Sequence, residues 1–385
     1  MERLEIVIVG AGAVGTAMAR ELAQAGRQVL VLEQNPGVSR GENQSTRNSG
    51  VIHAGLYYDP QTRPLKARLC PAGVGLLYAF CTQYGVPALN CGKLVVATSE
   101  QERPILQEYL ERARVNGVPA HLLSGDQARQ MEPQVRALAA LHLPTSGIID
   151  AAALVHKLYA LASNAGAIFL TGTKLVGVTP RPEGLELAVT YPDGAGDRFL
   201  AGRLINCAGL YSDQVARLVD PASPFRVDPV RGEAYKFYRG KRPELALRGM
   251  NVYPTPQRVV TAQGSYFTVG VHLTPTLEPG PGGQAQLGPI VTVGPLNRGV
   301  DSKEDLGGEY LPAGQFHQRV REFFPGLKQE DLEPFQAGIQ ARLVGHQDWV
   351  IEKSPQEPRC LNLLGIDSPG LTACLALARE AAARL

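Results

Sequence analysis

The chain has 385 residues, which is enough for about two domains with a substantial core. Its 38 basic and 36 acidic residues nearly balance, and no basic block or acidic tail interrupts the sequence, which argues against nucleic acid as a partner. The six cysteines show neither a C-x-x-C pair nor the spacing of metal ligands, so we expect a reduced, cytoplasmic protein that binds no metal.

No run approaches the roughly 20 apolar residues that span a bilayer, so we expect no transmembrane segment. The first predicted strand begins so close to Met1 that it leaves no room for a signal peptide. Peripheral contact with a membrane surface is left open by these observations.

The segment from residue 6 to residue 33 has the order of elements that begins a dinucleotide-binding fold. An unbroken apolar run at 6–9 predicts a strand buried on both faces, and it leads directly into a G-x-G-x-x-G turn at 10–15. A helical pattern at 16–25 and a second apolar strand at 28–32 follow. Strand, turn, helix and strand therefore occur together, which is more specific than the glycines alone.

Each glycine of this turn has its own expected task. Gly10 permits the tight turn, Gly12 lets the backbone approach a pyrophosphate, and Gly15 lets the helix pack closely on the strand. The helix N-terminus offers N–H groups and a partial positive charge to the phosphates. Glu33 ends the second strand, where an acid accepts hydrogen bonds from ribose hydroxyls and disfavours a 2′-phosphate, which leaves NAD or FAD.

The polar loop at 34–48 fits either a phosphate-facing loop or a solvated surface loop. A second strand, glycine turn and helix pass through Cys207, Ala208 and Gly209, and residues 222–300 alternate in a way that favours an antiparallel sheet. Further helices are predicted at 65–84, 101–116, 124–130, 151–165, 315–324 and 371–385. Further strands are predicted at 93–98, 167–170, 174–178, 185–191, 198–206, 339–344, 349–353 and 360–364.

This distribution predicts an α/β chain whose substrate part is α+β. We expect a Rossmann-like FAD-binding domain assembled from separated segments, with a substrate domain built on an antiparallel sheet inserted between them. Such an arrangement fits a flavoprotein better than an NAD dehydrogenase with one contiguous nucleotide half. The predicted FAD-binding domain comprises 1–90, 145–215 and 335–385, and the substrate domain comprises 91–144 and 216–334.

The segment Asn48 to Tyr58, followed by Leu65 to Cys70, closely resembles the L-2-hydroxyglutarate oxidase/dehydrogenase family of the D-amino-acid-oxidase-like FAD-dependent oxidoreductases. Residues 206–213, 231–233, 270–274 and 367–372 are similar as well. The resemblance implies FAD as cofactor and oxidation of a small 2-hydroxy acid, with L-2-hydroxyglutarate giving 2-oxoglutarate as the first candidate. It implies hydride transfer to flavin N5, with oxygen, a quinone or a carrier protein left open as electron acceptor.

One departure from the family pattern bears on the substrate. The family usually reads Gly-Ile-Arg-Ala near the last sheet strand, whereas this chain has Gln340 in place of the arginine. Arg342 is two residues further along, and in a strand it would point to the same face. We therefore expect Arg342 to be able to compensate.

The resemblance implies candidate site residues. The catalytic base is expected at His53, with His272 second, because a neutral histidine accepts protons near pH 7; a structural role is the alternative for both, and His53 could also tether FAD covalently. Because a dicarboxylate needs cationic anchors and hydroxyl donors, the predicted substrate-binding residues are Tyr57, Lys66, Arg68, Arg231, Tyr235, Tyr253 and Arg342, with a solvated charge or a contact between domains as the alternative for each. The predicted FAD-binding residues are Gly10, Gly12, Ala13, Val14, Gly15, Glu33, Gln34, Thr46, Asn48, Ser49, Gly50, Val51, Val176, Cys207, Ala208, Gly209, Gly370, Leu371 and Thr372.

Three alternatives remain at this point. The first is an FAD oxidoreductase for another small acid, an amine or glycerol 3-phosphate, which Gln340 favours. The second is a flavin-binding protein without turnover, and the third is an NAD dehydrogenase.

The helix that begins near Gly370 is expected to face the flavin pyrimidine end and to stabilise negative charge on the reduced ring.

Overall fold

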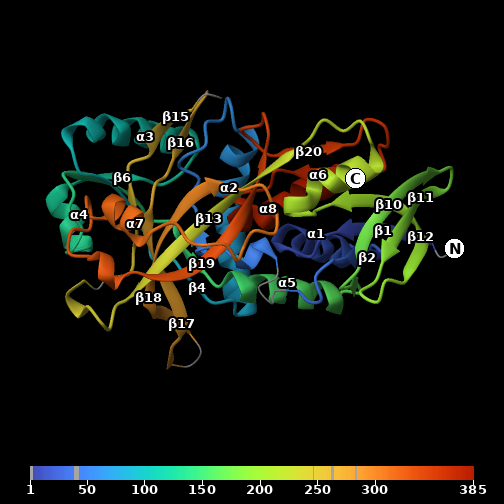
Figure 1. Cartoon of the computed structure of the whole chain (residues 1–385), viewed down its shortest axis with the longest axis horizontal. Coiled ribbons are helices and arrows are strands. Elements are labelled where there is room, and N and C mark those ends of the chain that lie inside the picture. Colours follow the sequence, from blue (N-terminus) through green and yellow to red (C-terminus); the bar gives the residue numbers. More distant parts are fainter. Residues whose placement is uncertain (1–2, 39–42, 246, 262–263, 282–283) are drawn as a thin grey trace.

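The computed structural model describes residues 3–38, 43–245, 247–261, 264–281 and 284–385. Two eight-stranded sheets dominate this part of the chain, together with one three-stranded and one two-stranded sheet. Both chain ends lie beside the first large sheet, on the right of Figure 1, and the second large sheet fills the left half. The structure is therefore mixed α/β, as the sequence predicts.

The first large sheet has a parallel centre in which β12 pairs with both β1 and β21, and β2 connects β1 to β9. The meander of β10 and β11 continues from the first half of β12, and β20 pairs antiparallel with β21. The strands are β1 (Arg3–Val9), β2 (Val29–Leu32), β9 (Ile168–Leu170), β10 (Lys174–Arg181), β11 (Gly184–Thr190), β12 (Gly196–Asn206), β20 (Val350–Lys353) and β21 (Cys360–Leu364).

Strand β1 is buried on both faces, which confirms the interpretation of its apolar run. Ile6 and Ile8 belong to one core cluster, whereas Val7 and Val9 belong to another on the opposite face. The first face is covered by α1 (Ala13–Gln24), which packs against α5 (Ala151–Asn164) and α8 (Gly370–Ala382), and α8 packs in turn against α2 (Pro64–Tyr84). Helix α6 (Ser212–Val219) contributes to the second face.

The second large sheet has the strand order β19-β13-β18-β17-β14-β5-β7-β6. All neighbours are antiparallel except β14 and β5, which confirms the antiparallel sheet expected for 222–300. Its strands are β5 (Lys93–Ala97), β6 (His121–Ser124), β7 (Ala139–Leu143), β13 (Val227–Tyr238), β14 (Asn251–Pro254), β17 (His272–Pro279), β18 (Ala285–Gly299) and β19 (Glu333–Leu343).

The division into two domains stays a prediction, with one correction at its last boundary. Strand β19 pairs along its length with β13, so its residues belong to the second sheet and not to the nucleotide part that we expected to begin at residue 335. The sequence misassigned it because a half-buried strand has the same alternation in either sheet. Within the described residues, no helix is long and apolar enough to cross a membrane.

The remaining elements join or cover the sheets. Helices α3, α4 and α7 lie at the far left of Figure 1, over the second sheet. The small sheet β3-β8-β4 connects the 51–58 segment to the entrance of α5. These elements are β3 (Val51–Ile52), β4 (Ala88–Leu89), α3 (Arg103–Val115), α4 (Gly125–Met131), β8 (Gly147–Ile149), β15 (Gln257–Thr261), β16 (Gly264–Thr268) and α7 (Ala313–Val320).

Candidate active site

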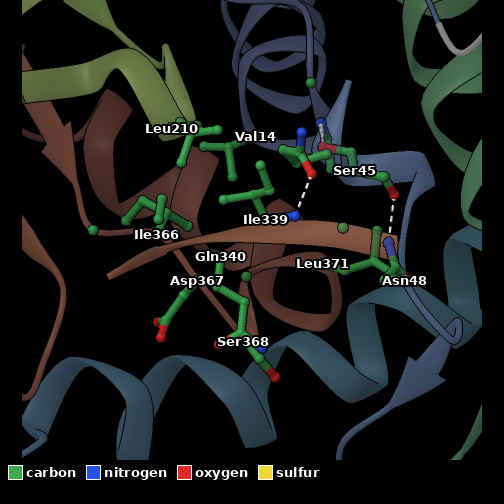
Figure 2. A pocket seen from close by; sticks show the side chains of 18 of the residues that line it. Val14, Ser45, Asn48, Leu210, Ile339, Gln340, Ile366, Asp367, Ser368 and Leu371 are labelled. Carbon is green, nitrogen blue, oxygen red and sulfur yellow. Dashed lines mark hydrogen bonds between the residues drawn. The ribbon is translucent and has the colours of Figure 1, made fainter. Parts of the chain in front are cut away.

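A cavity of about 1260 Å³ opens where the parallel strands of the first sheet end. Gly10 follows β1, Cys207 follows β12 and Gly365 follows β21, and all three line it. Ligands of open α/β sheets bind at this carboxyl edge. The cavity then continues to β19 and the second sheet, and Figure 2 shows Ile339 of β19 on the side of Val14, with Gln340 on the opposite side of the strand, toward Asp367 and Ser368.

The glycine turn is packed so tightly that side chains are excluded from it. Gly10 has φ +101°, and a Cβ there would lie 2.5 Å from the Cys207 carbonyl oxygen. A Cβ at Gly15 would overlap the Gly10 carbonyl oxygen, so helix α1 can approach β1 only with glycine at that position.

Helix α1 directs its N-terminus toward the cavity. Gly12 is the N-cap and provides no side-chain cap, and the N–H of Ala13 donates to Ser45 Oγ at 2.9 Å. Ser45 lies in the loop before β3, and Figure 2 shows it close to Val14. The first turn of α1 therefore keeps its positive end toward the site that an anionic group would occupy.

Glu33 is buried at the end of β2 and is held in one orientation. Its Oε2 accepts the Ala11 N–H at 2.7 Å, and its Oε1 accepts the Asn35 N–H at 2.8 Å. A carboxylate fixed in this way beside the glycine turn is placed to bind ribose hydroxyls.

Most predicted FAD-binding residues line this cavity, and two do not. Gly15 packs behind the turn, and Thr46 donates its hydroxyl to the Asn43 carbonyl. The register of β10 shifts beside Val176, which lies at the cavity wall. Residues 39–42 of the expected phosphate-facing loop lie outside the described residues. The lining residues are Gly10, Gly12, Ala13, Val14, Glu33, Gln34, Asn48, Ser49, Gly50, Val51, Val176, Cys207, Ala208, Gly209, Gly370, Leu371 and Thr372.

His53 lies where the 51–58 segment meets the start of α8. Its N–H donates to Thr372 Oγ1 at 3.0 Å, its carbonyl accepts the Cys70 thiol, and its Nε2 is 3.3 Å from Ser368 Oγ. Its Nδ1 is buried without a partner among the described residues, whereas Nε2 lies beside Ser368, which lines the cavity. Burial, followed by the charges of Lys93 and His272, lowers the pKa of His53 well below its ordinary value.

His272 is stacked on Tyr253 in the second sheet, and both line the cavity. The ring centroids are 3.8 Å apart and the planes differ by 12°. The His272 Nδ1 lies 3.0 Å from the Gly270 carbonyl oxygen, so Nδ1 carries the proton and Nε2 is the acceptor of the neutral ring. Burial lowers the pKa of His272 to about 3. Both predicted histidines are therefore neutral near pH 7.

Gln340 and Arg342 lie on the same face of β19, as the strand period predicts. Arg342 Nε donates to Gln340 Oε1 at 3.3 Å, and both residues line the cavity. Lys66 also lines it and forms a 2.8 Å ion pair with Asp367. The buried hydroxyl of Tyr57 has no hydrogen-bond partner within the described ranges, so it is available to a ligand.

Three of the predicted substrate-binding residues lie outside the cavity lining. Arg68 is exposed and pairs with Glu380. Arg231 is fully buried, and its guanidinium is bound by Glu233, Asp305 and the Gly308 carbonyl. The hydroxyl of Tyr235 donates to the Leu311 carbonyl. The guanidinium groups of both arginines and the tyrosine hydroxyl are therefore already bound within the protein and are not available to a substrate.

Two arginines that the sequence analysis did not select do line the cavity. They are Arg47, before Asn48, and Arg63, the N-cap of α2. The Nε of each is buried without a hydrogen-bond partner in the described part of the chain. Neither belongs to a periodic pattern that would have distinguished it from a solvated arginine.

A protein-family model described as "FAD dependent oxidoreductase" (DAO) matches residues 5–384. The chain belongs to the DAO family. It is 33% identical to the mitochondrial L-2-hydroxyglutarate dehydrogenase of Arabidopsis thaliana, over 99% of this chain and 83% of that protein. It is 34% identical to the human mitochondrial L-2-hydroxyglutarate dehydrogenase, over 74% of this chain and 60% of that protein. With the Escherichia coli L-2-hydroxyglutarate dehydrogenase it shares 26% identity, over 96% and 90%.

Solved structures of this DAO-family fold cover the whole chain. The L-α-glycerophosphate oxidase of Mycoplasma pneumoniae with FAD bound superposes with a TM-score of 0.84 at 26% identity, over 100% of this chain and 95% of that one. The glycine oxidase of Geobacillus kaustophilus superposes with a TM-score of 0.78 at 20% identity, over 99% and 94%, which supports the fold alone.

The residues of this DAO-family chain fit FAD. The glycine turn and the α1 N-terminus suit a pyrophosphate, and the Glu33 carboxylate suits the adenosine ribose. Helix α8 begins at Gly370 without a side-chain cap, so its N–H groups can meet the polar edge of a flavin. The volume of about 1260 Å³ exceeds that of most single-ligand pockets, which leaves room for a substrate beside the cofactor. FAD is therefore the cofactor.

Proposed function

We propose that this chain oxidises L-2-hydroxyglutarate to 2-oxoglutarate in an FAD-dependent reaction. The observation that carries the proposal is the continuity of one cavity, which joins the dinucleotide site to a compartment with two neutral histidines and several cationic side chains. A dicarboxylate that must lose a proton and a hydride needs both features. The names of the relatives support the same substrate.

The mechanism divides the two hydrogens of the substrate between cofactor and protein. When bound, FAD supplies the acceptor for the hydride that leaves the substrate Cα. The hydroxyl proton passes to Nε2 of His53, so the C–H and O–H bonds break and the carbonyl π bond forms. Because burial favours the neutral ring, His53 is in its proton-accepting form at neutral pH. Ser368, at 3.3 Å, orients the ring.

The two carboxylates of the substrate need cationic side chains that are partly shielded from water. Arg342 is steered toward the cavity by Gln340, and the buried Nε of Arg63 supplies a second donor. Lys66 is already paired with Asp367, which makes it a weaker candidate. We assign one carboxylate to Arg342 and the other to Arg63, with Tyr57 as an additional hydroxyl donor.

A panel of substrates with an artificial electron acceptor tests the function. L-2-Hydroxyglutarate is expected to be turned over, whereas the D-enantiomer and a monocarboxylic 2-hydroxy acid give little activity. Glycerol 3-phosphate is the second candidate, because Gln340 replaces the family arginine and the glycerophosphate oxidase fold is similar. Turnover of glycerol 3-phosphate alone would replace the first assignment. If no substrate of the panel reduces the bound FAD, the chain is a flavin-binding protein without turnover.

Arg63→Met is expected to raise KM for L-2-hydroxyglutarate by roughly 10- to 100-fold, because a charged hydrogen bond to a carboxylate is lost. The kcat should change little, since Arg63 contacts no reacting atom in the proposed arrangement. The matched control is Arg68→Met in the next turn of the same helix, because Arg68 is exposed and pairs with Glu380. Equal KM values for wild type and Arg63→Met, measured by steady-state kinetics, would contradict the assignment.

A further inference from the structure

Lys93 is a buried lysine that the proposed mechanism does not use. It begins β5 in the second sheet, and only 1% of its surface is exposed. Within the described residues, no carboxylate or hydrogen-bond acceptor is found at its ammonium group. Its ammonium group makes cation–π contacts with two aromatic rings, with Nζ 3.9 Å from the Tyr253 centroid and 5.7 Å from the Tyr57 centroid. Burial of an amine without a counter-ion costs free energy of folding, so we expect Lys93 to have a functional role.

Lys93, Tyr253 and His272 form a stack across three neighbouring strands, β5, β14 and β17. The His272 ring lies 3.8 Å from the Tyr253 centroid, and the Lys93 ammonium lies 3.9 Å from the same centroid. Two groups this close to one ring must lie on opposite faces of it. Tyr253 and His272 line the cavity, and the Lys93 ammonium packs against the Tyr253 ring.

The surroundings of Lys93 supply no negative charge near neutral pH. Burial raises the pKa of the Cys70 thiol beyond the accessible range and that of Cys91 to about 11, so both are neutral. Burial lowers the pKa of Lys93 itself to about 7, and its charge is one cause of the lowered pKa of each histidine. The titratable groups that face Lys93 from the packed elements are His53, Tyr57, Cys70, Cys91, Tyr253 and His272.

We propose that Lys93 is a positioning residue, whose charge behind Tyr253 keeps His53 and His272 in their neutral, proton-accepting form and draws an anionic substrate into the compartment. The sign follows from Coulomb repulsion between like charges. Below about pH 7 Lys93 is an ammonium, and this is the range in which an ordinary histidine would take up a proton. Only the second part of this inference, the attraction of an anionic substrate, rests on the proposed function. The protonation state of the two histidines is a property of the FAD-loaded enzyme without substrate.

Histidine titration in the substrate-free holoenzyme tests the first half. The protein is labelled with ¹³C at histidine Cε1, and the resonances of His53 and His272 are identified among the seven histidines by their loss in His53→Gln and His272→Gln. In the wild type both rings are expected to stay neutral well below the ordinary histidine pKa of about 6.5. A His53 resonance that is already cationic at that pH would overturn the proposal without any variant.

Lys93→Met removes the charge and keeps an apolar stem, and it is expected to raise the pKa of His53 by about one pH unit. Lys93→Arg retains the charge and is expected to leave the titration as in the wild type. An unchanged His53 titration in Lys93→Met would contradict the proposal, because burial alone would then account for the neutral ring. Flavin absorbance and circular dichroism report whether each variant remains folded and loaded.

The kinetic arm tests the substrate half separately. In Lys93→Met the acid limb of kcat/KM for L-2-hydroxyglutarate should move to higher pH by the same amount as the His53 titration, and KM should rise at neutral pH. If the His53 titration shifts in Lys93→Met but the wild type does not turn over L-2-hydroxyglutarate, the effect of the Lys93 charge on His53 stands and the proposed substrate is rejected. Turnover with an unshifted acid limb and an unchanged KM would sustain the substrate and reject Lys93.

Discussion

His53→Gln is expected to lower kcat by about 10²- to 10⁴-fold, the usual contribution of a general base. Glutamine has nearly the size of histidine but accepts no proton at neutral pH. The contacts that hold the segment in place are main-chain contacts, because the His53 N–H donates to Thr372 and its carbonyl accepts the Cys70 thiol. The variant should therefore fold and retain FAD, and steady-state kinetics at saturating substrate measures the loss.

The control for this variant is His156→Gln. His156 is exposed on α5, so the same substitution there should leave kcat unchanged. The pH dependence gives a second readout: because the pKa of His53 is lowered, wild-type activity should persist below the ordinary histidine pKa of about 6.5 and fall only at lower pH. Full turnover of FAD-loaded His53→Gln would transfer the role of base to His272.

Gly15→Ala is expected to abolish FAD binding and to destabilise the fold by about 3 kcal/mol. The added Cβ would overlap the carbonyl oxygen of Gly10, and no rotation of a methyl group relieves a contact with backbone. Helix α1 must then move away from β1, which opens the turn beside Glu33. The ratio of visible flavin absorbance to protein absorbance measures bound FAD, and thermal unfolding measures stability.

Gly75→Ala is the matched control for this substitution. Gly75 is an exposed residue inside α2, and a Cβ there meets nothing within 4 Å. Alanine favours a helix over glycine by about 1 kcal/mol, so this variant should be as stable as the wild type or more stable. If Gly15→Ala retained FAD as well as Gly75→Ala, the close packing of turn and helix would not be what the cofactor requires.

The sequence predicts the nucleotide half well because its signals are local. Strand, glycines, helix and acid follow one another between Ile6 and Glu33, and each depends on backbone geometry that neighbouring residues determine. The shared face of Gln340 and Arg342 is likewise a property of one strand, whose period places alternate side chains together.

The substrate half depends on contacts between distant segments, which the sequence does not reveal. Arg231 was a candidate anchor, but Glu233 and Asp305 enclose its guanidinium. Arg63 carries no pattern of its own and gains its place only because α2 begins at the cavity. Lys93 begins an apolar strand, where a lysine usually reaches solvent, and only the packing of the sheet shows that it is buried.

The central claim is tested most directly by a single turnover without oxygen. The FAD-loaded protein is mixed anaerobically with L-2-hydroxyglutarate, and the visible flavin band is followed while 2-oxoglutarate is assayed. The proposed function predicts rapid bleaching of the band with one 2-oxoglutarate formed per flavin, and no bleaching with the D-enantiomer. A band that stays unchanged at saturating L-2-hydroxyglutarate would contradict the assigned substrate while leaving the FAD site intact.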